Sequence, residues 1–247
     1  MSGRLFWPIL SLLLLLAVWE MAALLAPAAS LPPPLQVARV MVDSLVRGDL
    51  GHHLLTTLGR VAAAFTLSLV VGSCLGITLG RVAVLDRLLD FWVVFFLNLP
   101  ALVTAILCFV WFGLTEGAAL AAVALNKIPS VVVTLREGAR TLDPGFRDLA
   151  QVYGFGRWKT LHHVILPQLA PYLMVAARSG LALIWKIVLV VELLGRSDGI
   201  GFKLHVFFQS FDVAAILAYS LAFILVVQAV ELLVLAPLDR RLGGWRD

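Results

Sequence analysis

Charged residues are scarce in this sequence. Only 14% of the 247 residues are Asp, Glu, Lys or Arg, whereas 61% are hydrophobic. A soluble domain carries about a quarter charged residues and is about half apolar, so this composition excludes an ordinary soluble fold. Several apolar runs reach the roughly 20 residues that a helix needs to cross a bilayer core. The composition therefore predicts an all-α integral membrane protein, placed in a single transmembrane domain over residues 1–247.

Motifs for metal binding and for nucleotide binding are also lacking. Cys74 and Cys108 lie in apolar runs without metal-ligand spacing, so we expect no metal site and two small buried side chains. None of the lysines follows a glycine, which excludes a phosphate-binding G-x4-G-K-[ST] loop. The metalloprotease pattern H-E-x-x-H does not occur, and no catalytic residue is predicted. The chain is expected to bind no cofactor of its own.

Six spanning helices are predicted, with a positive-inside orientation. Eleven Lys and Arg residues fall on one side of the spans and four on the other, which places both termini in the cytoplasm (N-in and C-in). Because the basic residues flank apolar segments, they indicate topology rather than nucleic-acid binding. The first run is too long for a signal-peptide core, and a retained helix is favoured over a cleaved signal. The predicted spans are 5–26, 54–80, 91–113, 117–135, 168–194 and 212–236.

Two segments between the spans are polar. The outer segment, about 27–53, begins with three prolines and continues at helical spacing, which predicts a short helix along the outer surface. It is either a connector on lipid headgroups or a contact for a partner. The cytoplasmic segment, about 136–167, contains the stretch RDLAQVYGFGRWKTLHHVILP, from Arg147 to Pro167.

This cytoplasmic stretch is predicted to form two short helices joined by a glycine turn. Asp143 is suited to cap the first helix, and Pro144 fits its first position because the missing N–H has no helical partner there. Gly154 is suited to a left-handed end. A second helical run covers 157–166, and Pro167 either ends it or opens the next span. An amphipathic loop at the membrane interface is the alternative. The apolar stripe of the first helix is Phe146, Leu149, Ala150 and Tyr153.

The same stretch resembles a motif of bacterial ABC importer permeases, E-A-A-x3-G-x9-I-x-L-P. Asp148-Leu149-Ala150 stands at the start, Gly154 follows after three residues, and Val164-Ile165-Leu166-Pro167 follows after nine more. Asp replaces Glu and Leu replaces the first Ala. Further segments resemble the nitrate/sulfonate/taurine-type permeases: Trp19-Glu20, LPPP at 31–34, WFG at 111–113 and VVELLGRSDGIG at 190–201.

The resemblance implies a multi-pass permease of the bacterial cytoplasmic (inner) membrane. It further implies docking of ABC ATPase subunits, which carry ATP and Mg, on the cytoplasmic face. A second copy of the permease, an extracytoplasmic solute-binding protein and membrane lipid are the other partners expected. Transport by alternating access would carry a small solute such as a sulfonate, a nitrate-like anion or an organic acid. The candidate docking residues are Phe146, Arg147, Asp148, Leu149, Ala150, Tyr153, Gly154, Phe155, Gly156, Arg157 and Trp158.

Polar residues inside the predicted spans are candidates for the translocation pathway. Lys186 and Glu192 lie about 120° apart on one helix, so each needs a partner elsewhere. Lys127 or Lys186 is predicted to attract an anionic solute, or else to be neutralised by a nearby acid or to extend toward a membrane interface. Pro100 and Pro129 are expected to kink their helices, around a pathway or as packing irregularities. The pathway candidates are Asn98, Asn126, Lys127, Lys186 and Glu192.

Two other classes of protein remain as alternatives. An ion-coupled secondary carrier often has repeated halves, and no repeat is visible in this sequence. An intramembrane enzyme would favour paired histidines at i, i+4, whereas His52-His53 and His162-His163 are adjacent and do not face one site. Solute uptake without an ATPase would indicate the carrier.

Overall fold

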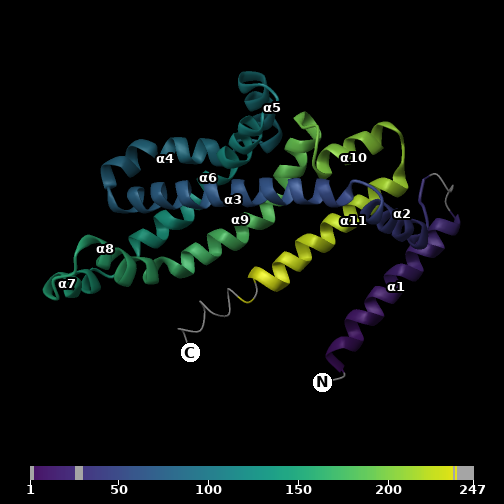
Figure 1. The fold of residues 1–247 in the computed structure, drawn as a ribbon. Helices are drawn as coiled ribbons and strands as arrows, with labels where there is room; N and C mark the ends of the chain where they lie inside the picture. Colours follow the sequence, from purple (N-terminus) through teal and green to yellow (C-terminus); the bar gives the residue numbers. More distant parts are fainter. Residues whose placement is uncertain (1–2, 26–29, 236, 238–247) are drawn as a thin grey trace.

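Every secondary-structure element in the described residues is a helix, which confirms the prediction of an all-α protein (Figure 1). The computed structural model describes residues 3–25, 30–235 and 237. The elements are α1 (Gly3–Leu25), α2 (Pro34–Val46), α3 (Leu50–Arg81), α4 (Ala83–Leu97), α5 (Ala101–Phe112), α6 (Glu116–Arg140), α7 (Pro144–Val152), α8 (Arg157–Thr160), a π turn (Leu161–Ile165), α9 (Leu166–Gly195), α10 (Ile200–Gln209), α11 (Val213–Val230) and a second π turn (Glu231–Leu235).

Five of the predicted spans correspond to single helices of the described chain, namely α1, α3, α6, α9 and α11. Each of these runs is long and apolar enough to cross a membrane. The predicted helix in the segment 27–53 is present as α2, which begins at Pro34 with Pro33 as its N-cap. The sequence pattern thus located most of the helices, because long apolar runs specify spanning helices and prolines specify helix starts without contacts from distant residues.

The predicted span 91–113 is present, but the kink expected at Pro100 divides it into two helices. Its residues form the end of α4 and all of α5, two helices bent by 98° at residues 98–100. Pro100 has no N–H to continue the helical hydrogen bonds, and a proline also disfavours the helical conformation of the residue before it. Asn126 of α6 steadies the bend, since its Nδ2 lies 3.4 Å from both the Leu99 carbonyl oxygen and Thr104 Oγ1. Counted as one broken span, the pair gives the expected number of six. Pro129, by contrast, lies within a continuous α6.

The centre of the bundle is a close contact between α3 and α6. A Cβ placed on Gly72, Gly76 or Gly80 of α3 would lie 2.6–2.8 Å from atoms of α6. The nearest side chains are Val131 for Gly72, Leu135 for Gly76 and Ala139 for Gly80, so each step of four residues on α3 matches four on α6. Small residues at this spacing let two membrane helices approach until their backbones touch.

The two cysteines differ in burial. Cys108 is buried, as predicted. Cys74 lies between Gly72 and Gly76 in the sequence but on another face of α3, and it is exposed, which contradicts the prediction.

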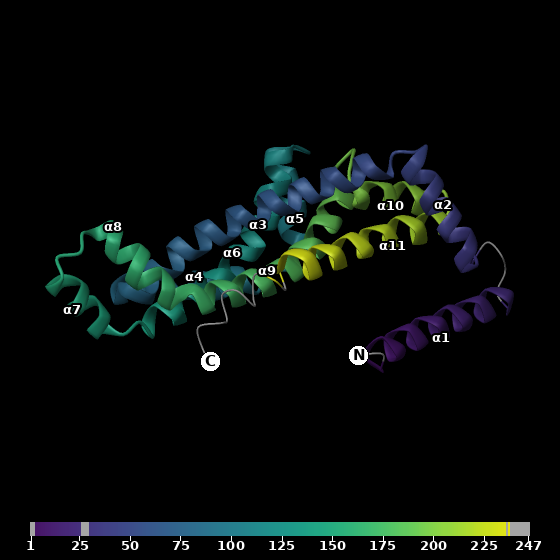
Figure 2. The same ribbon diagram turned by 60° about the horizontal axis from the view of Figure 1, so that its bottom comes forward.

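The longest helical run connects the two ends of the molecule. Residues Arg157–Gly195 form 39 continuous helical residues, made of α8, the π turn and α9. The second short helix predicted at 157–166 is therefore the beginning of the fifth span, and Pro167 lies in the first turn of α9 instead of ending a helix. Figures 1 and 2 show α7 and α8 at one end of the bundle, whereas α10 and α2 lie at the other.

The first helix, α1, lies largely outside the bundle (Figure 2). None of its most apolar window is buried within the described chain. Trp19 Nε1 donates a hydrogen bond to the Pro32 carbonyl oxygen over 3.1 Å, which ties α1 to the segment before α2. Its exposed leucines suit contact with lipid tails.

Candidate functional site

The first helix and the glycine turn of the α7–α8 segment fold as the sequence predicts, whereas the second helical run continues into α9. Asp143 caps α7 by accepting a hydrogen bond from the Gly145 N–H over 2.8 Å, and Pro144 occupies the first helical position. Gly154 ends the helix with φ +64°, a conformation that costs other residues free energy because of their Cβ. The Phe155 N–H then donates to the Ala150 carbonyl oxygen over 2.8 Å and closes the turn. A helix, a left-handed turn and the start of α8 are thus set by local sequence.

The apolar side chains of this segment are largely exposed. Of the predicted stripe, only Ala150 is buried. Val152 is 84% exposed and belongs with the exposed apolar residues, although it lies outside the predicted stripe. An exposed apolar patch is a candidate for contact with a protein partner or a membrane surface. Its members in the described chain, hereafter the α7–α8 patch, are Phe146, Leu149, Val152, Tyr153 and Trp158.

The remaining docking candidates surround this patch. Asp148, Gly156 and Arg157 are exposed, and Phe155 is half-buried beneath the Lys159 ammonium group, which lies 4.2 Å from the ring centre. The side chain of Arg147 lies outside the described residues. On the side facing the bundle, Gln168 of α9 accepts a hydrogen bond from the Asp143 N–H over 3.0 Å. The patch is therefore attached to α9 both along the chain and by this contact.

The pathway candidates lie in different environments. Asn98 is exposed and donates to the Val94 carbonyl oxygen of its own helix over 2.7 Å. Asn126 is half-buried and binds the bend between α4 and α5. Lys127 is 1% exposed and donates to Ser130 Oγ over 3.0 Å, whereas Lys186 is exposed and makes no ion pair within the described residues. Glu192 is fully buried. The structure therefore separates the two lysines: one lies inside the bundle and the other on its surface.

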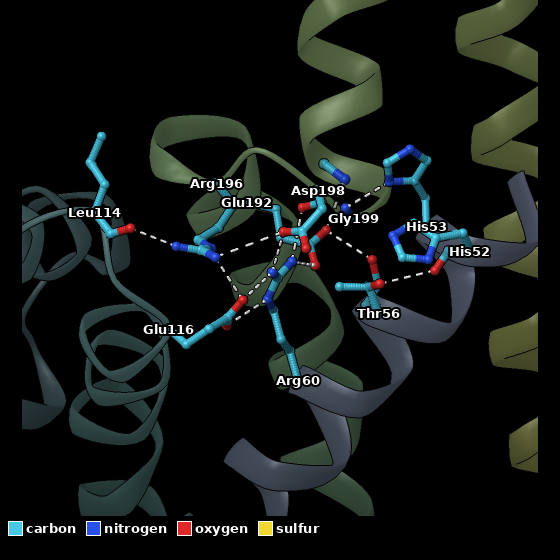
Figure 3. Close-up of polar contacts among 12 residues, drawn as sticks. His52, His53, Thr56, Arg60, Leu114, Glu116, Glu192, Arg196, Asp198 and Gly199 are labelled. Carbon is cyan, nitrogen blue, oxygen red and sulfur yellow. Dashed lines mark hydrogen bonds and ion pairs between the residues drawn. The ribbon is translucent and has the colours of Figure 1, made fainter. Parts of the chain in front are cut away.

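Glu192 belongs to a buried polar cluster at the α10 end (Figure 3). Its Oε1 accepts a hydrogen bond from Arg60 Nη1 of α3 over 2.7 Å, and its Oε2 accepts one from Thr57 Oγ1 over 2.9 Å. Because a buried charge is costly unless it is paired and hydrogen-bonded, these contacts explain how a carboxylate is accommodated here. Glu192 indeed pairs with another helix and not with Lys186, as its angular position predicted.

Arg60 is the centre of this cluster, which we call the Arg60 cluster. Its guanidinium group, 6% exposed, binds Glu116 through two hydrogen bonds of 2.5 and 3.0 Å and also pairs with the Asp198 carboxylate. Arg196 completes the cluster with a 2.7 Å hydrogen bond to Glu116. Three carboxylates and two guanidinium groups thus join α3, α6, α9 and the loop before α10. Arg60 is not among the predicted pathway residues, although an arginine within an apolar span is itself a signal of function.

Outside the spans, two carboxylates have lowered pKa values. Burial raises the pKa of Asp49, but the hydrogen bonds from Lys203 (2.7 Å) and Tyr219 (2.6 Å) outweigh burial and hold the pKa well below its usual range. Burial likewise raises the pKa of Asp198, and the hydrogen bond and charge of Arg60 outweigh it and lower the pKa. Because both pKa values are lowered, the stabilisation is complete above the usual pKa range of aspartate and is lost progressively as the pH falls through that range towards each lowered pKa.

The fold and these two sites define a multi-helix membrane protein with an exposed apolar patch at one end and a largely buried ionic cluster at the other. The family model of the binding-protein-dependent transport system inner membrane component matches residues 68–241, so the chain belongs to this family. It is accordingly a transport permease that crosses the bacterial inner membrane several times. Members of this family are the membrane subunits of their transport systems.

Characterised relatives extend over most of the chain. The putative aliphatic sulfonates transport permease protein SsuC of Escherichia coli (strain K12) is 30% identical over 76% of this chain and 72% of its own length. The taurine transport system permease protein TauC of the same strain is 27% identical over 95% and 88%. The riboflavin transport system permease protein RibX of Chloroflexus aurantiacus is 28% identical over 98% and 92%. These similarities confirm the predicted resemblance to ABC importer permeases of the nitrate/sulfonate/taurine type.

Proposed function

We propose that this permease forms the translocation pathway of an ABC importer and works by ATP-driven alternating access. The observation that carries the proposal is the α7–α8 patch. Its large apolar side chains are exposed and lie in the segment that matches the family's motif spacing, and this segment continues directly into a spanning helix. Large aromatic side chains contribute most of the energy in protein interfaces, so this patch suits a protein partner.

The partner at the patch is an ABC ATPase subunit that holds ATP and Mg. The α7–α8 end then faces the cytoplasm and the α10 end faces outward, in agreement with the charge distribution of the sequence and with an N-in, C-in topology. A second copy of the permease and a solute-binding protein on the outer face complete the transporter within the lipid bilayer. Closure of the ATPase pair would displace the patch and change the access of the pathway.

The glycine turn provides a test of ATPase docking. Gly154→Val is expected to abolish copurification of the coexpressed ATPase, because valine strongly disfavours φ +64° and the patch residues on either side of the turn would be displaced. The measurement is the ATPase-to-permease ratio after affinity purification in detergent.

Two controls belong to this experiment. Gly154→Asn keeps the turn, because asparagine tolerates the left-handed conformation, and should retain the ATPase. Gly156→Ala lies in the same loop at φ −66° with open space around its Cβ, and should also retain it. Equal recovery of the ATPase with Gly154→Val and with the wild type would contradict docking at this segment.

The solute is proposed to be a small anion, such as a sulfonate, a nitrate-like ion or an organic acid. The named solutes of two relatives, aliphatic sulfonates and taurine, both carry a sulfonate group, whereas riboflavin, named for the third, is uncharged. Lys186 supports the anionic class, because an exposed ammonium group within a spanning helix is costly in lipid and is better placed in a water-filled pathway.

Removing this charge has an expected consequence for transport. Lys186→Met should lower uptake of an anionic solute about tenfold, since one nearby charge in a partly desolvated site is worth a few kcal/mol at most. Lys186→Arg should retain uptake, and Lys127→Met, which changes the buried lysine, should leave the preference for anions unchanged. The solute used is the one that thermally stabilises the solute-binding protein. The measurement is the uptake of this solute into proteoliposomes that contain the transporter. Undiminished uptake with Lys186→Met would remove Lys186 from the pathway.

A further inference from the structure

The beginning of α10 is held by side chains from two other helices. The Gly199 N–H donates to His53 Nδ1 over 3.0 Å, the Ile200 N–H to Thr57 Oγ1 over 2.8 Å, and the Gly201 N–H to Glu192 Oε2 over 2.9 Å. The first N–H groups of a helix have no partner within the helix, so these bonds replace what the helix itself cannot supply. Because His53 and Thr57 belong to α3 and Glu192 to α9, the start of α10 is attached to both.

The backbone of α10 also lies directly against α9. A Cβ on Gly199 would collide with the Glu192 carboxylate, and one on Gly201 would collide with the Leu189 carbonyl group. Gly199 adopts φ +102°, which further restricts the position to glycine. There is thus no layer of side chains between the two helices at this point that could yield when one of them moves.

Thr57 connects the three helices through one hydroxyl group. It donates to Glu192 on α9 and accepts from the Ile200 N–H on α10, while its own backbone belongs to α3. Its side chain is fully buried, and Arg60 binds the other oxygen of Glu192. Thr57 and Glu192 therefore position α10 relative to α9 and α3 without facing a pathway in this structure.

The opposite end of α9 is the α7–α8 patch. The helical run that begins at Arg157 in α8 ends at Gly195, three residues beyond Glu192. At 1.5 Å per residue, these 39 residues span about 58 Å. A displacement at the patch can thus reach Glu192 along one continuous helical run.

We propose that Thr57 and Glu192 form a rigid joint through which α10 moves together with α9. This joint delivers the ATP-driven displacement of the α7–α8 patch to the outer face of the transporter. The inference rests on the proposed function, because it requires an ATPase at the patch. It assigns to these two residues a positioning role in transport and not contact with solute.

The test measures one distance in the permease–ATPase complex. Spin labels are attached at Leu183→Cys on α9 and Phe208→Cys on α10, both exposed positions, in a Cys74→Ser background, and the complex is placed in nanodiscs. In the wild-type joint the distance is expected to remain the same with and without ATP and Mg. Thr57→Val removes the hydroxyl group at nearly constant volume and should allow an ATP-dependent shift of about 1–5 Å, the range of helix displacements in switching proteins. Thr57→Ser keeps the hydroxyl group and should behave as the wild type.

Three results would overturn the joint. The first is an ATP-dependent distance with Thr57 intact, since α10 would then move independently of α9. The second is an unchanged, narrow distance distribution in Thr57→Val while that complex still hydrolyses ATP. The third applies if Thr57→Val does not assemble: an ATP-dependent distance in Thr57→Ser, which keeps the hydroxyl group. If no ATPase is recovered with the wild-type permease, the proposed function itself fails, which is a distinct outcome.

Discussion

Replacing Gly76 by leucine is expected to prevent α3 and α6 from packing and to destabilise the permease by about 3 kcal/mol or more, at the upper end for overpacked cores. A Cβ at this position would lie 2.7 Å from the Val132 carbonyl oxygen and 2.8 Å from the Leu135 Cβ. A backbone carbonyl cannot rotate away as a long side chain can. The helices must therefore separate, and the contacts of Gly72 and Gly80 would be lost with them.

The measurement is the yield of monodisperse protein in detergent together with its thermal unfolding midpoint. Cys74→Leu is the matched control, because Cys74 lies two residues away on the same helix and is exposed. It should leave both quantities near the wild-type values. A Gly76→Leu protein with the wild-type midpoint would contradict the close contact of α3 and α6.

Replacing Arg60 by methionine is expected to have an effect of similar size for an electrostatic reason. The change leaves Glu192, which is fully buried, without a countercharge and leaves Glu116 and Asp198 without their shared guanidinium group. Removing one partner of a buried ion pair typically costs about 3–5 kcal/mol, because the other charge stays buried. The unfolding midpoint should fall accordingly.

A double variant separates the charge from the loss of packing. Arg60→Met combined with Glu192→Met should unfold at a higher temperature than Arg60→Met alone, since no unpaired buried carboxylate remains at position 192. Additive destabilisation by the two changes would contradict the pairing. The comparison uses purified permease in one detergent, so membrane composition does not enter.

Much of the fold could be predicted from the sequence, because the signals that specify it are local. Apolar runs of spanning length located α1, α3, α6, α9 and α11. The cap at Asp143 and the left-handed turn at Gly154 followed from the chemistry of Asp and Gly alone. The same reasoning predicted a kink at Pro100 but not its size, and the structure has a bend of 98° at residues 98–100. How far a helix bends at a proline depends on its neighbours, here Asn126, and these are distant in sequence.

The candidate sites also have a part that local sequence predicts and a part that depends on tertiary contacts. The α7–α8 patch was predicted with most of its residues, because a short helix leaves few of its side chains to be covered. Val152 was missed because its exposure depends on how the segment is placed against the bundle. The four-residue spacing of Gly72, Gly76 and Gly80 is visible in the sequence and indicates a close helix contact, but it does not name the partner helix.

By itself, the sequence determined the class of protein, the course of most helices and most of the exposed α7–α8 patch. Those properties depend on composition and on interactions within a few residues. Only the tertiary structure decided that Arg60 neutralises Glu192, that Thr57 joins three helices, and that Lys127 is buried while Lys186 is exposed. These pairings span more than 130 residues of chain in the Arg60 cluster, and burial is a property of the packed bundle. No periodicity along one helix specifies which side chain another helix will present to it.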